Sequence, residues 1–379
     1  MQRSLVKVLH VVGARPNFMK IAPVIRAVEA WNASADTSGT QFEQVLVHTG
    51  QHYDRALSTV FFEQLGLPEP DEYLGVGSGT QADQTARLMS ALEPVVERHE
   101  PNLVVVPGDV NSTLAAALVA AKLGVPVAHL EAGLRSGDRT MPEEINRIVT
   151  DHLSDVLLTT CVDADVNLAR EGLSSRHVRR VGNTMIDTLV RLRPKAEEAF
   201  ERTRVAVGLP DADFALVTLH RPSNVDDPNQ LARLMRVLAK VAREVPVVFP
   251  VHLRTRRQLA GLDVESSSGL TLSEPLGYLE FLGLMAQAAV VITDSGGIQE
   301  ETSFLGVPCV TVRSCTERPV TVVDGTNVLV DPSDESAILS AVRGAIARGL
   351  SSPPPAIGLW DGAAGGRVVE AFVEWAQGA

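Results

Sequence analysis

Acidic side chains stand where apolar segments of the sequence end. Asp109 closes the segment LVVVPGD, Glu131 closes PVAHLE, and Glu143 follows Pro142 at the start of a helical pattern. A carboxylate at the end of a buried strand costs free energy unless it is paired or used. Asp109 and Glu131 are therefore candidates for a functional role, and Glu143 is a third candidate at the start of its helix.

Each of these carboxylates also has a structural interpretation. Asp109 lies two residues before Asn111, where a carboxylate can cap the next helix. Glu143 and its neighbour Glu144 open a helix, and acidic side chains suit the helix dipole there. The structural interpretation is weaker for Glu131, because a glycine rather than a helix follows it.

The stretch DSGGIQEE, residues 294–301, follows a strand-like segment and begins a helical one. Backbone N–H groups and the helix dipole at such a point favour a phosphate, and glycines let the ligand approach closely. Glu300 and Glu301 follow one turn later, where one of them can accept the hydroxyls of a ribose. A plain helix cap made by Asp294 or Ser295 is the alternative.

Cationic side chains follow other strand-like segments. Arg15 and Lys20 flank the turn after the first segment, and His220 and Arg221 follow a later one. Such groups suit a phosphate or an anionic leaving group. A single Lys or Arg on a loop is more commonly a solvated charge, and a single His is more commonly structural.

Strand-like runs alternate with helical patterns along the chain. The alternation predicts parallel sheets covered on both faces by helices. We expect an α/β protein of two doubly wound, Rossmann-like domains, whose ligand-binding edges face each other across a cleft. The expected strands are 5–12, 42–48, 102–109, 126–131, 155–160, 177–183, 214–220, 246–252, 290–296, 306–313 and 326–330. Helices are expected over segments such as Ile21–Trp31, Asn111–Leu123 and Arg367–Ala376.

Composition excludes several other classes of protein. The 379 residues carry a net charge of −12, which argues against nonspecific nucleic-acid binding. The 3 cysteines form no C-x-x-C pair, so we expect neither a disulfide framework nor a zinc site. The longest apolar stretch, 114–128, is short and contains Lys122, and the N-terminus resembles a first strand rather than a signal peptide. We therefore expect a cytoplasmic protein that binds no membrane.

Together these stretches resemble the non-hydrolysing UDP-N-acetylglucosamine 2-epimerases. The matching pieces occur in family order along nearly the whole chain, and D-S-G-G-I-Q-E-E with T-E-R-P downstream is the most specific combination. They are G-A-R-P-x-x-M-K at 13–20, G-Q-H at 50–52, G-D at 108–109, E-A-G-L-R-S at 131–136, P-E-E-I-N-R at 142–147, H-R at 220–221, E-P-x-x-Y-x-x-F at 274–281, D-S-G-G-I-Q-E-E at 294–301 and T-E-R-P at 316–319.

The resemblance implies a GT-B-like fold and a homodimer. It implies an N-terminal domain over 1–186, a nucleotide-binding domain over 187–364 and a terminal helix, 365–379, that packs back on the first domain. It also implies reversible conversion of UDP-GlcNAc to UDP-ManNAc without metal, nicotinamide or any other cofactor. The implied mechanism is anti-elimination of UDP to 2-acetamidoglucal, followed by readdition to the other face.

The resemblance also assigns roles to residues, without separating the base at C2 from the acid. Glu301 matches the ribose-binding position, and Phe281 matches the position at the uracil. The implied catalytic residues are Asp109, Glu131, Glu143 and His220. The implied substrate-binding residues are Arg15, Lys20, Arg135, Phe281, Ser295, Gly296, Gly297, Glu301 and Arg318. Gln51, His52 and Gln81 match the site of a second, activating UDP-GlcNAc. The charge-rich loop between Glu131 and Glu143 is expected to be held in shape by Arg135, Asp138, Arg139 and Arg147.

Departures from the family pattern leave the substrate and the reaction open. Ser223 stands where many members have a glutamate, and Tyr53 follows the G-Q-H stretch where others have a Met-containing sequence. A modified UDP-sugar, such as a uronate or a deoxy diamino sugar, is therefore a second possible substrate. Three further functions compete with the epimerase: a hydrolysing epimerase that releases ManNAc and UDP, a GT-B glycosyltransferase, and a catalytically inactive sensor of nucleotide sugars.

Overall fold

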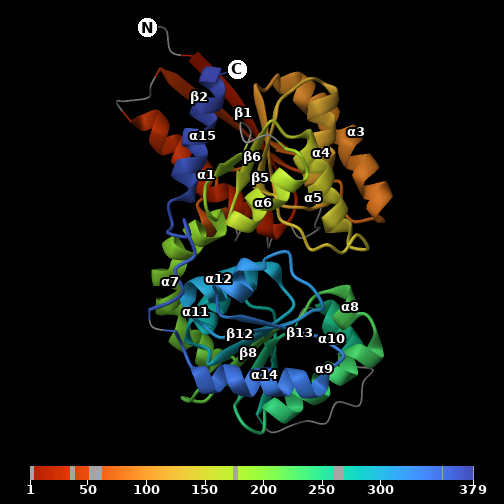
Figure 1. Cartoon of the computed structure of the whole chain (residues 1–379), viewed down its shortest axis with the longest axis vertical. Coiled ribbons are helices and arrows are strands. Elements are labelled where there is room, and N and C mark those ends of the chain that lie inside the picture. Colours follow the sequence, from red (N-terminus) through yellow and green to blue (C-terminus); the bar gives the residue numbers. More distant parts are fainter. Residues whose placement is uncertain are drawn as a thin grey trace. The chain divides into compact units, whose positions relative to one another are not determined.

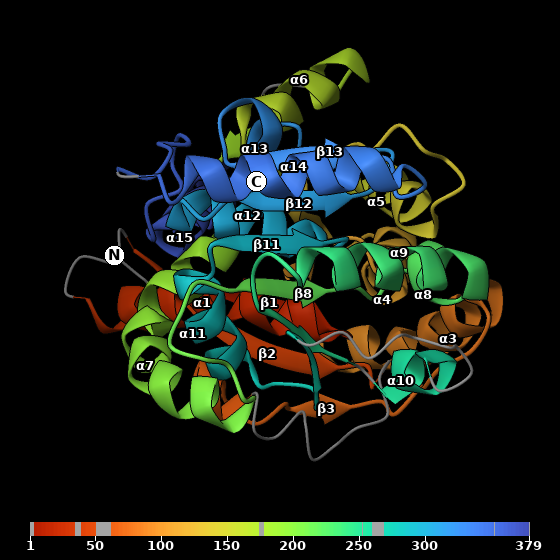
Figure 2. The same ribbon diagram turned by 90° about the horizontal axis from the view of Figure 1, so that it is seen from below.

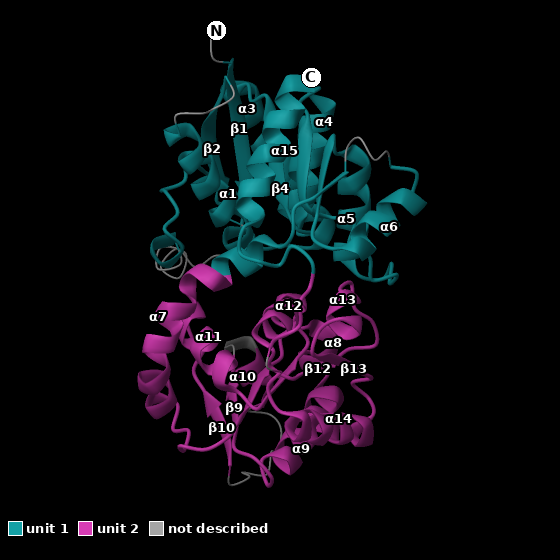
Figure 3. Ribbon diagram, turned by 60° about the vertical axis from the view of Figure 1, so that its left-hand side comes forward, with its two compact units in different colours: residues 1–188, 358–379 teal, residues 189–357 magenta. Residues whose placement is uncertain are grey.

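The chain forms two compact units, which Figure 3 colours separately. Unit 1 comprises residues 1–188 and 358–379, and unit 2 comprises residues 189–357. The computed structural model describes residues 4–34, 39–50, 62–173, 178–251, 253–259, 269–351 and 353–378. Gln51 and His52, both expected at an activating site, lie outside the described residues.

Unit 1 is built on a 7-stranded sheet in which every paired strand is parallel. Its spatial order is β3-β2-β1-β4-β5-β6-β7. The central strand β4 (LVVVP) is buried along its whole length, as expected for a strand covered on both faces. The strands are β1 (Ser4–Val12), β2 (Thr40–His48), β3 (Glu72–Tyr73), β4 (Leu103–Pro107), β5 (Val127–Ala132), β6 (Val156–Thr159) and β7 (Val178–Arg180).

Helices cover both faces of this sheet (Figure 1). Helices α1 (Arg15–Ala33) and α15 (Ala364–Gly378) pack together on one face, although they come from opposite ends of the chain. The other face carries α3, α4 and α5, and α4 contacts both of the others. Their bounds are α3 (Gln81–His99), α4 (Asn111–Lys122) and α5 (Pro142–Leu153); α6 (Val162–Arg170) follows β6, and α7 (Thr184–Ala206) begins in unit 1 and ends in unit 2.

Unit 2 repeats the design with 6 parallel strands in the order β10-β9-β8-β11-β12-β13. Figure 2 shows β8, β11, β12 and β13 side by side. Helices α9 and α14 pack on one face over a core of buried aliphatic side chains. The elements are β8 (Ala215–Thr218), α8 (Pro222–Val225), α9 (Pro228–Val241), β9 (Val247–Pro250), α10 (Leu253–Leu259), β10 (Leu270–Ser273), α11 (Tyr278–Gln287), β11 (Val290–Thr293), α12 (Gly296–Leu305), β12 (Cys309–Val312), α13 (Val320–Val323), β13 (Asn327–Val330) and α14 (Glu335–Arg348).

Asp187 and Gly365 fix the start of α15 against the rest of unit 1. The Asp187 carboxylate accepts hydrogen bonds from the backbone N–H groups of Ala364, at 3.1 Å, and Gly365, at 2.7 Å. A Cβ at Gly365 would lie 2.7 Å from the carbonyl oxygen of Pro23, inside α1. The close approach of α15 to α1 therefore requires glycine at this position.

The predicted alternation of parallel strands and helices is confirmed in both units. Two edge strands, β3 and β10, escaped prediction, because β3 has 2 residues and β10 is only half buried and lacks a continuous apolar run. Helix α1 begins at Arg15 rather than near Ile21, since Pro16 suits a first helical turn. Helix α15 begins at Ala364 rather than Arg367, because Asp187 binds the N–H groups of its first turn.

Each sheet changes its strand order at one central point, between β1 and β4 in unit 1 and between β8 and β11 in unit 2. Ligands of open α/β sheets bind beyond the carboxyl ends of the strands at such points. Arg15 and Asp109 follow β1 and β4, and His220 and Ser295 follow β8 and β11. Of the helices that the structure describes, none combines the length and the apolar character needed to cross a bilayer.

Candidate active site

The buried side chain of Asn17 ties the two central strand ends of unit 1 together. Its Oδ1 accepts from the backbone N–H groups of Gly13, at 3.2 Å, and Ala14, at 3.0 Å. Its Nδ2 donates to the carbonyl oxygen of Pro107 at 2.8 Å. Asn17 thereby fixes the turn that carries Arg15, an exposed residue at the start of α1, beside the turn that carries Asp109.

Lys20 and Glu131 form a buried ion pair beside this turn. The Lys20 Nζ lies 2.5 Å from Glu131 Oε2, and the two residues are 5% and 4% exposed. Gly108 has a φ of 68°, which favours glycine, and a Cβ there would lie 2.8 Å from the Lys20 Nζ and would displace the ammonium. The structure thus brings together two predicted site residues, a carboxylate that can accept a proton and an ammonium that can neutralise a developing negative charge.

The backbone at Glu131 is strained. Glu131 has a φ of 71°, in the left-handed region that side chains other than glycine rarely adopt. The pairing of β5 with β6 shifts register between Leu130 and Ala132, on either side of it. Such strain costs on the order of 1–3 kcal/mol and concentrates at functional sites. The conformation supports a functional role for Glu131 over the structural interpretation.

Asp109 is held from α5 by Arg147, which makes ion pairs with both Asp109 and Glu144. Asn146, on the same helix, donates from Nδ2 to the Asp109 carbonyl oxygen at 2.9 Å. The N-cap of α4 is Val110, without a side-chain cap. Asp109 thus lies one residue before the N-cap position, and its carboxylate pairs with a guanidinium.

Glu144 anchors the charge-rich loop that follows β5. Its carboxylate accepts from the backbone N–H groups of Ser136 and Gly137, each at 2.9 Å, and pairs with Arg147. Burial alone would raise the pKa of the Glu144 carboxyl, but these contacts hold that pKa below its ordinary value. Asp138 closes a turn by accepting from Thr140. Asp138 thus supports the loop as predicted, whereas Arg147 reaches the loop only through Glu144, the main anchor, which was not predicted.

Glu143 occupies the first turn of α5 and is half buried. Within the described part of the chain it has no hydrogen-bond or ion-pair partner, in contrast to Asp109 and Glu131. Arg135, by contrast, has two ion-pair partners, because Asp151 and Glu171 each pair with its guanidinium at 2.7 Å. The substrate-binding role of Arg135 stays a prediction.

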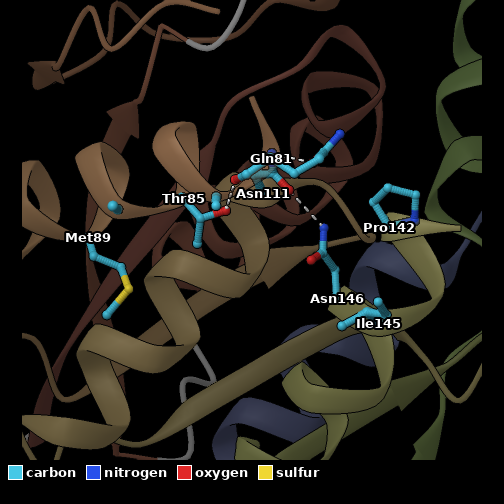
Figure 4. Close-up of a pocket in the computed structure, with 9 residues that line it drawn as sticks. Gln81, Thr85, Met89, Asn111, Pro142, Ile145 and Asn146 are labelled. Carbon is cyan, nitrogen blue, oxygen red and sulfur yellow. Dashed lines mark hydrogen bonds between the residues drawn. The ribbon is translucent and has the colours of Figure 1, made fainter. Parts of the chain in front are cut away.

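Gln81 begins α3 and lines a pocket of about 380 Å³ between α3, α4 and α5 (Figure 4). Asn111 donates from Nδ2 to Gln81 Oε1 at 2.8 Å, and Asn146 donates to Asn111 Oδ1 at 3.1 Å. These amides link the pocket to the backbone at Asp109. The pocket is lined by Gln81, Ala82, Thr85, Ala86, Met89, Asn111, Pro142, Ile145 and Asn146.

In unit 2, the loop after β11 leads into α12. Ser295 is the N-cap of this helix, yet it makes no side-chain cap. Asp294, the other candidate cap, instead accepts from the backbone N–H groups of His220 and Arg221. The interpretation as a plain helix cap is therefore wrong, and the first turn, with Gly296 and Gly297, has the form of an anion-binding helix start.

Asp294 also orients His220. The His220 Nδ1 lies 3.0 Å from Asp294 Oδ1, and the His220 side chain is 57% exposed whereas that of Asp294 is fully buried. Burial alone would raise the pKa of the Asp294 carboxyl. The hydrogen bonds from His220, Asn224 and Arg221 nevertheless hold that pKa below its ordinary value. A carboxylate on Nδ1 fixes the imidazole so that its Nε2 is available for acid–base work.

Buried carboxylates crowd the first turns of α12. Glu301 accepts from the hydroxyl of Tyr278 at 2.6 Å, and burial together with the charge of Glu300 raises the Glu301 pKa to about 7. Arg318 lies 2.9 Å from Glu300 and also pairs with Glu317. A Cβ at Gly296 would lie 2.5 Å from Arg318 Nη1, so the glycine lets this guanidinium reach the helix start. The half-buried Phe281 lies one turn after Tyr278 on α11.

Comparisons with known proteins identify the family. The family model described as UDP-N-acetylglucosamine 2-epimerase matches residues 35–373. The chain belongs to the UDP-N-acetylglucosamine 2-epimerase family. It is 41% identical to the UDP-N-acetylglucosamine 2-epimerase of Methanocaldococcus jannaschii over 341 residues, which cover 88% of this chain and 90% of the relative.

The epimerase family includes members for other sugars. The chain is also 41% identical to the UDP-2,3-diacetamido-2,3-dideoxy-D-glucuronate 2-epimerase of Pseudomonas aeruginosa, over 88% of this chain and 91% of the relative. Among solved structures, the M. jannaschii UDP-GlcNAc 2-epimerase in complex with UDP-GlcNAc and UDP matches with a TM-score of 0.86 and 38% identity. That match covers 97% of this chain and 100% of the other, and the predicted GT-B-like class is confirmed.

The contacts of several residues in the candidate site were not predicted from the sequence, among them those of Asn17, Glu144 and Tyr278. One signal was readable: Glu144, Arg147 and Asp151 lie at helical spacing and share one face of α5. A charged face that is also buried indicates a polar network rather than a solvated surface. In the described part of the chain, no group of 3 or more His, Cys, Asp or Glu side chains is arranged to hold a metal ion.

Proposed function

We propose that this chain is a non-hydrolysing 2-epimerase that interconverts UDP-GlcNAc and UDP-ManNAc. The observation that carries the proposal is the group of carboxylates and cations at the central strand ends of unit 1. There, Glu131 is strained and paired with Lys20, and Asp109 is paired with Arg147. A sugar nucleotide that loses and regains both a proton and UDP needs these two kinds of group.

The reaction is an anti-elimination followed by readdition. A carboxylate removes the C2 proton, the C1–O bond to UDP breaks with its electron pair leaving on UDP, and a C1=C2 double bond forms in 2-acetamidoglucal. Return of a proton to the other face of C2 and attack of UDP at C1 give the epimer. We assign the proton transfers jointly to Asp109, Glu131, Glu143 and His220, and carboxylates also stabilise the electron-poor sugar.

The same proposal assigns UDP to the helix start in unit 2. The diphosphate would accept from the N–H groups of the first turn of α12, from Arg318 and from His220, with Arg15 and Lys20 as further cations. Glu301 would accept the ribose hydroxyls and Phe281 would lie at the uracil. The uncapped start of α12 supports the phosphate assignment.

Further proposals rest on the family resemblance. We propose a cytoplasmic homodimer and an activating subsite that includes Gln51, His52 and Gln81. The position of Gln81 in a pocket joined through Asn111 and Asn146 to the Asp109 backbone supports a link between that subsite and the candidate acids. A UDP-2,3-diacetamido uronate is the second candidate substrate, because a relative named for that sugar is as similar as one named for UDP-GlcNAc.

The test is turnover of a panel of UDP-sugars, followed by proton and phosphorus NMR. UDP-ManNAc formed from UDP-GlcNAc, with the reverse reaction from UDP-ManNAc, is the expected result. Free ManNAc and UDP would assign the hydrolysing reaction instead. Turnover of the diacetamido uronate alone would assign that sugar, and transfer of a sugar to an acceptor would overturn the epimerase proposal.

A further inference from the structure

The buried face of α5 continues beyond Glu144 and Arg147 to Asp151, one helical turn further on. The Asp151 side chain is fully buried, and burial of an ionised carboxylate costs several kcal/mol unless its oxygens are satisfied. Asp151 therefore needs partners, and their positions indicate what the residue does.

The partners of Asp151 lie on both sides of Glu131. Its Oδ1 lies 2.6 Å from the Nδ1 of His129, two residues before Glu131. Its Oδ2 accepts from the backbone N–H of Gly133 at 3.0 Å, two residues after Glu131. The Nη1 of Arg135 also lies 2.7 Å from Oδ2. One carboxylate thus holds both ends of the strained turn at Glu131.

His129 extends this network to the other candidate acid. Its Nε2 lies 2.7 Å from the carbonyl oxygen of Gly108, the residue that precedes Asp109. A carbonyl oxygen only accepts, so the Nε2 of His129 donates to Gly108 while its Nδ1 faces the Asp151 carboxylate. Burial alone would raise the pKa of the Asp151 carboxyl, but the charges of His129 and Arg135 hold that pKa below its ordinary value.

We propose that Asp151 is a positioning residue that sets the relative placement of Glu131 and Asp109. It holds the Glu131 turn directly, through Gly133, and the Asp109 turn indirectly, through His129 and the Gly108 carbonyl. The strained φ of Glu131 makes this support necessary, because an unsupported turn would relax toward an ordinary backbone conformation. The inference rests on the proposed function, since it assigns a role for acids that the epimerase reaction uses.

The test compares Asp151→Asn with Glu171→Gln. Each substitution removes a different one of the two carboxylates that pair with Arg135. Only Asp151 also contacts His129 and the Gly133 N–H. We expect Asp151→Asn to lower kcat for epimerisation about 10- to 100-fold, because a small displacement of a reacting group has effects of this size. KM and the affinity for UDP should stay within about twofold, and Glu171→Gln should match wild type.

The outcomes separate the inference from the function. Equal kcat values for Asp151→Asn and Glu171→Gln, with the wild type active, would overturn the positioning role alone. A wild-type chain that epimerises no UDP-sugar would overturn the proposed function and the inference with it. If Asp151→Asn loses its cooperative thermal transition, His129→Gln replaces it; this variant keeps a donor for the Gly108 carbonyl but loses the ion pair. A similar loss of kcat is then expected, and wild-type kcat would overturn the proposal.

Discussion

At the scale of single residues, three of the four candidate acids and bases pair with a charged neighbour. Asp109 faces Arg147, Glu131 faces Lys20 and His220 faces Asp294. Glu143 has no such partner among the residues that the structure describes, which distinguishes its carboxylate from the others. These differences make the roles separable by substitution of the neighbour instead of the acid itself.

Asp294→Asn tests whether His220 acts through its orientation. The amide oxygen can still accept from the backbone, but the carboxylate that holds the imidazole is lost. We expect kcat to fall about 10- to 100-fold, since an oriented acid or base contributes at least this much, and the melting temperature to fall as well, because the buried Asp294 carboxylate accepts several hydrogen bonds. Asp331→Asn, in an exposed turn of the same unit, is the control. Wild-type kcat in a folded Asp294→Asn variant would show that His220 needs no orientation by Asp294.

Glu301→Gln tests the raised pKa of the buried carboxyl in unit 2. The folded chain keeps Glu301 protonated up to about pH 7, whereas the unfolded chain releases the proton near pH 4.5. The free energy of unfolding of the wild type therefore falls as pH rises through this window and is constant above it. Glutamine cannot ionise and can still accept from the Tyr278 hydroxyl.

The variant should therefore gain stability over wild type by about 1–3 kcal/mol between pH 4.5 and pH 8. Denaturant unfolding at several pH values measures this difference. In the same variant, UDP should bind more weakly if Glu301 accepts the ribose hydroxyls. A stability difference between variant and wild type that is independent of pH would contradict the raised pKa.

At the scale of elements, the contact between α15 and α1 depends on a glycine. Gly365→Ala would place a Cβ 2.7 Å from the Pro23 carbonyl oxygen, so one helix must move. We expect a loss of about 1–3 kcal/mol in the free energy of unfolding, as for other overpacked contacts. The neighbouring Gly366 is the matched control, because its Cβ would have no atom within 4 Å. Gly366→Ala should be neutral or slightly stabilising, and equal effects of the two substitutions would contradict the packing argument.

The elements themselves were largely predictable from the sequence, whereas the contacts that hold the candidate site were not. Buried strands such as β4 show a continuous apolar run, and glycine-rich turns mark their ends. The edge strands β3 and β10 lack that run, since β3 has 2 residues and β10 (LTLS) alternates apolar and polar residues. Contacts such as Asp151 with His129 join residues 22 apart in sequence, and no local pattern specifies which carboxylate meets which cation.

At the scale of the whole molecule, two parallel sheets of similar design each place polar residues at the point where the strand order changes. The predicted site residues divide between them, with the three candidate carboxylates in unit 1 and both His220 and the proposed phosphate-binding helix start in unit 2. The overall charge of −12 disfavours an anionic ligand at long range. If the chain binds a UDP-sugar as proposed, recognition depends on local cations such as Lys20 and Arg318 and on the α12 N–H groups.

The most direct test of this account follows the C2 proton. The wild-type chain is incubated with UDP-GlcNAc in D2O, and proton NMR reads the C2 position of both sugar nucleotides. The account predicts deuterium at C2 in UDP-ManNAc and in the recovered UDP-GlcNAc, because the carboxylates of unit 1 exchange their protons with solvent during reversible elimination. UDP-ManNAc that accumulates with protium at C2 would contradict it.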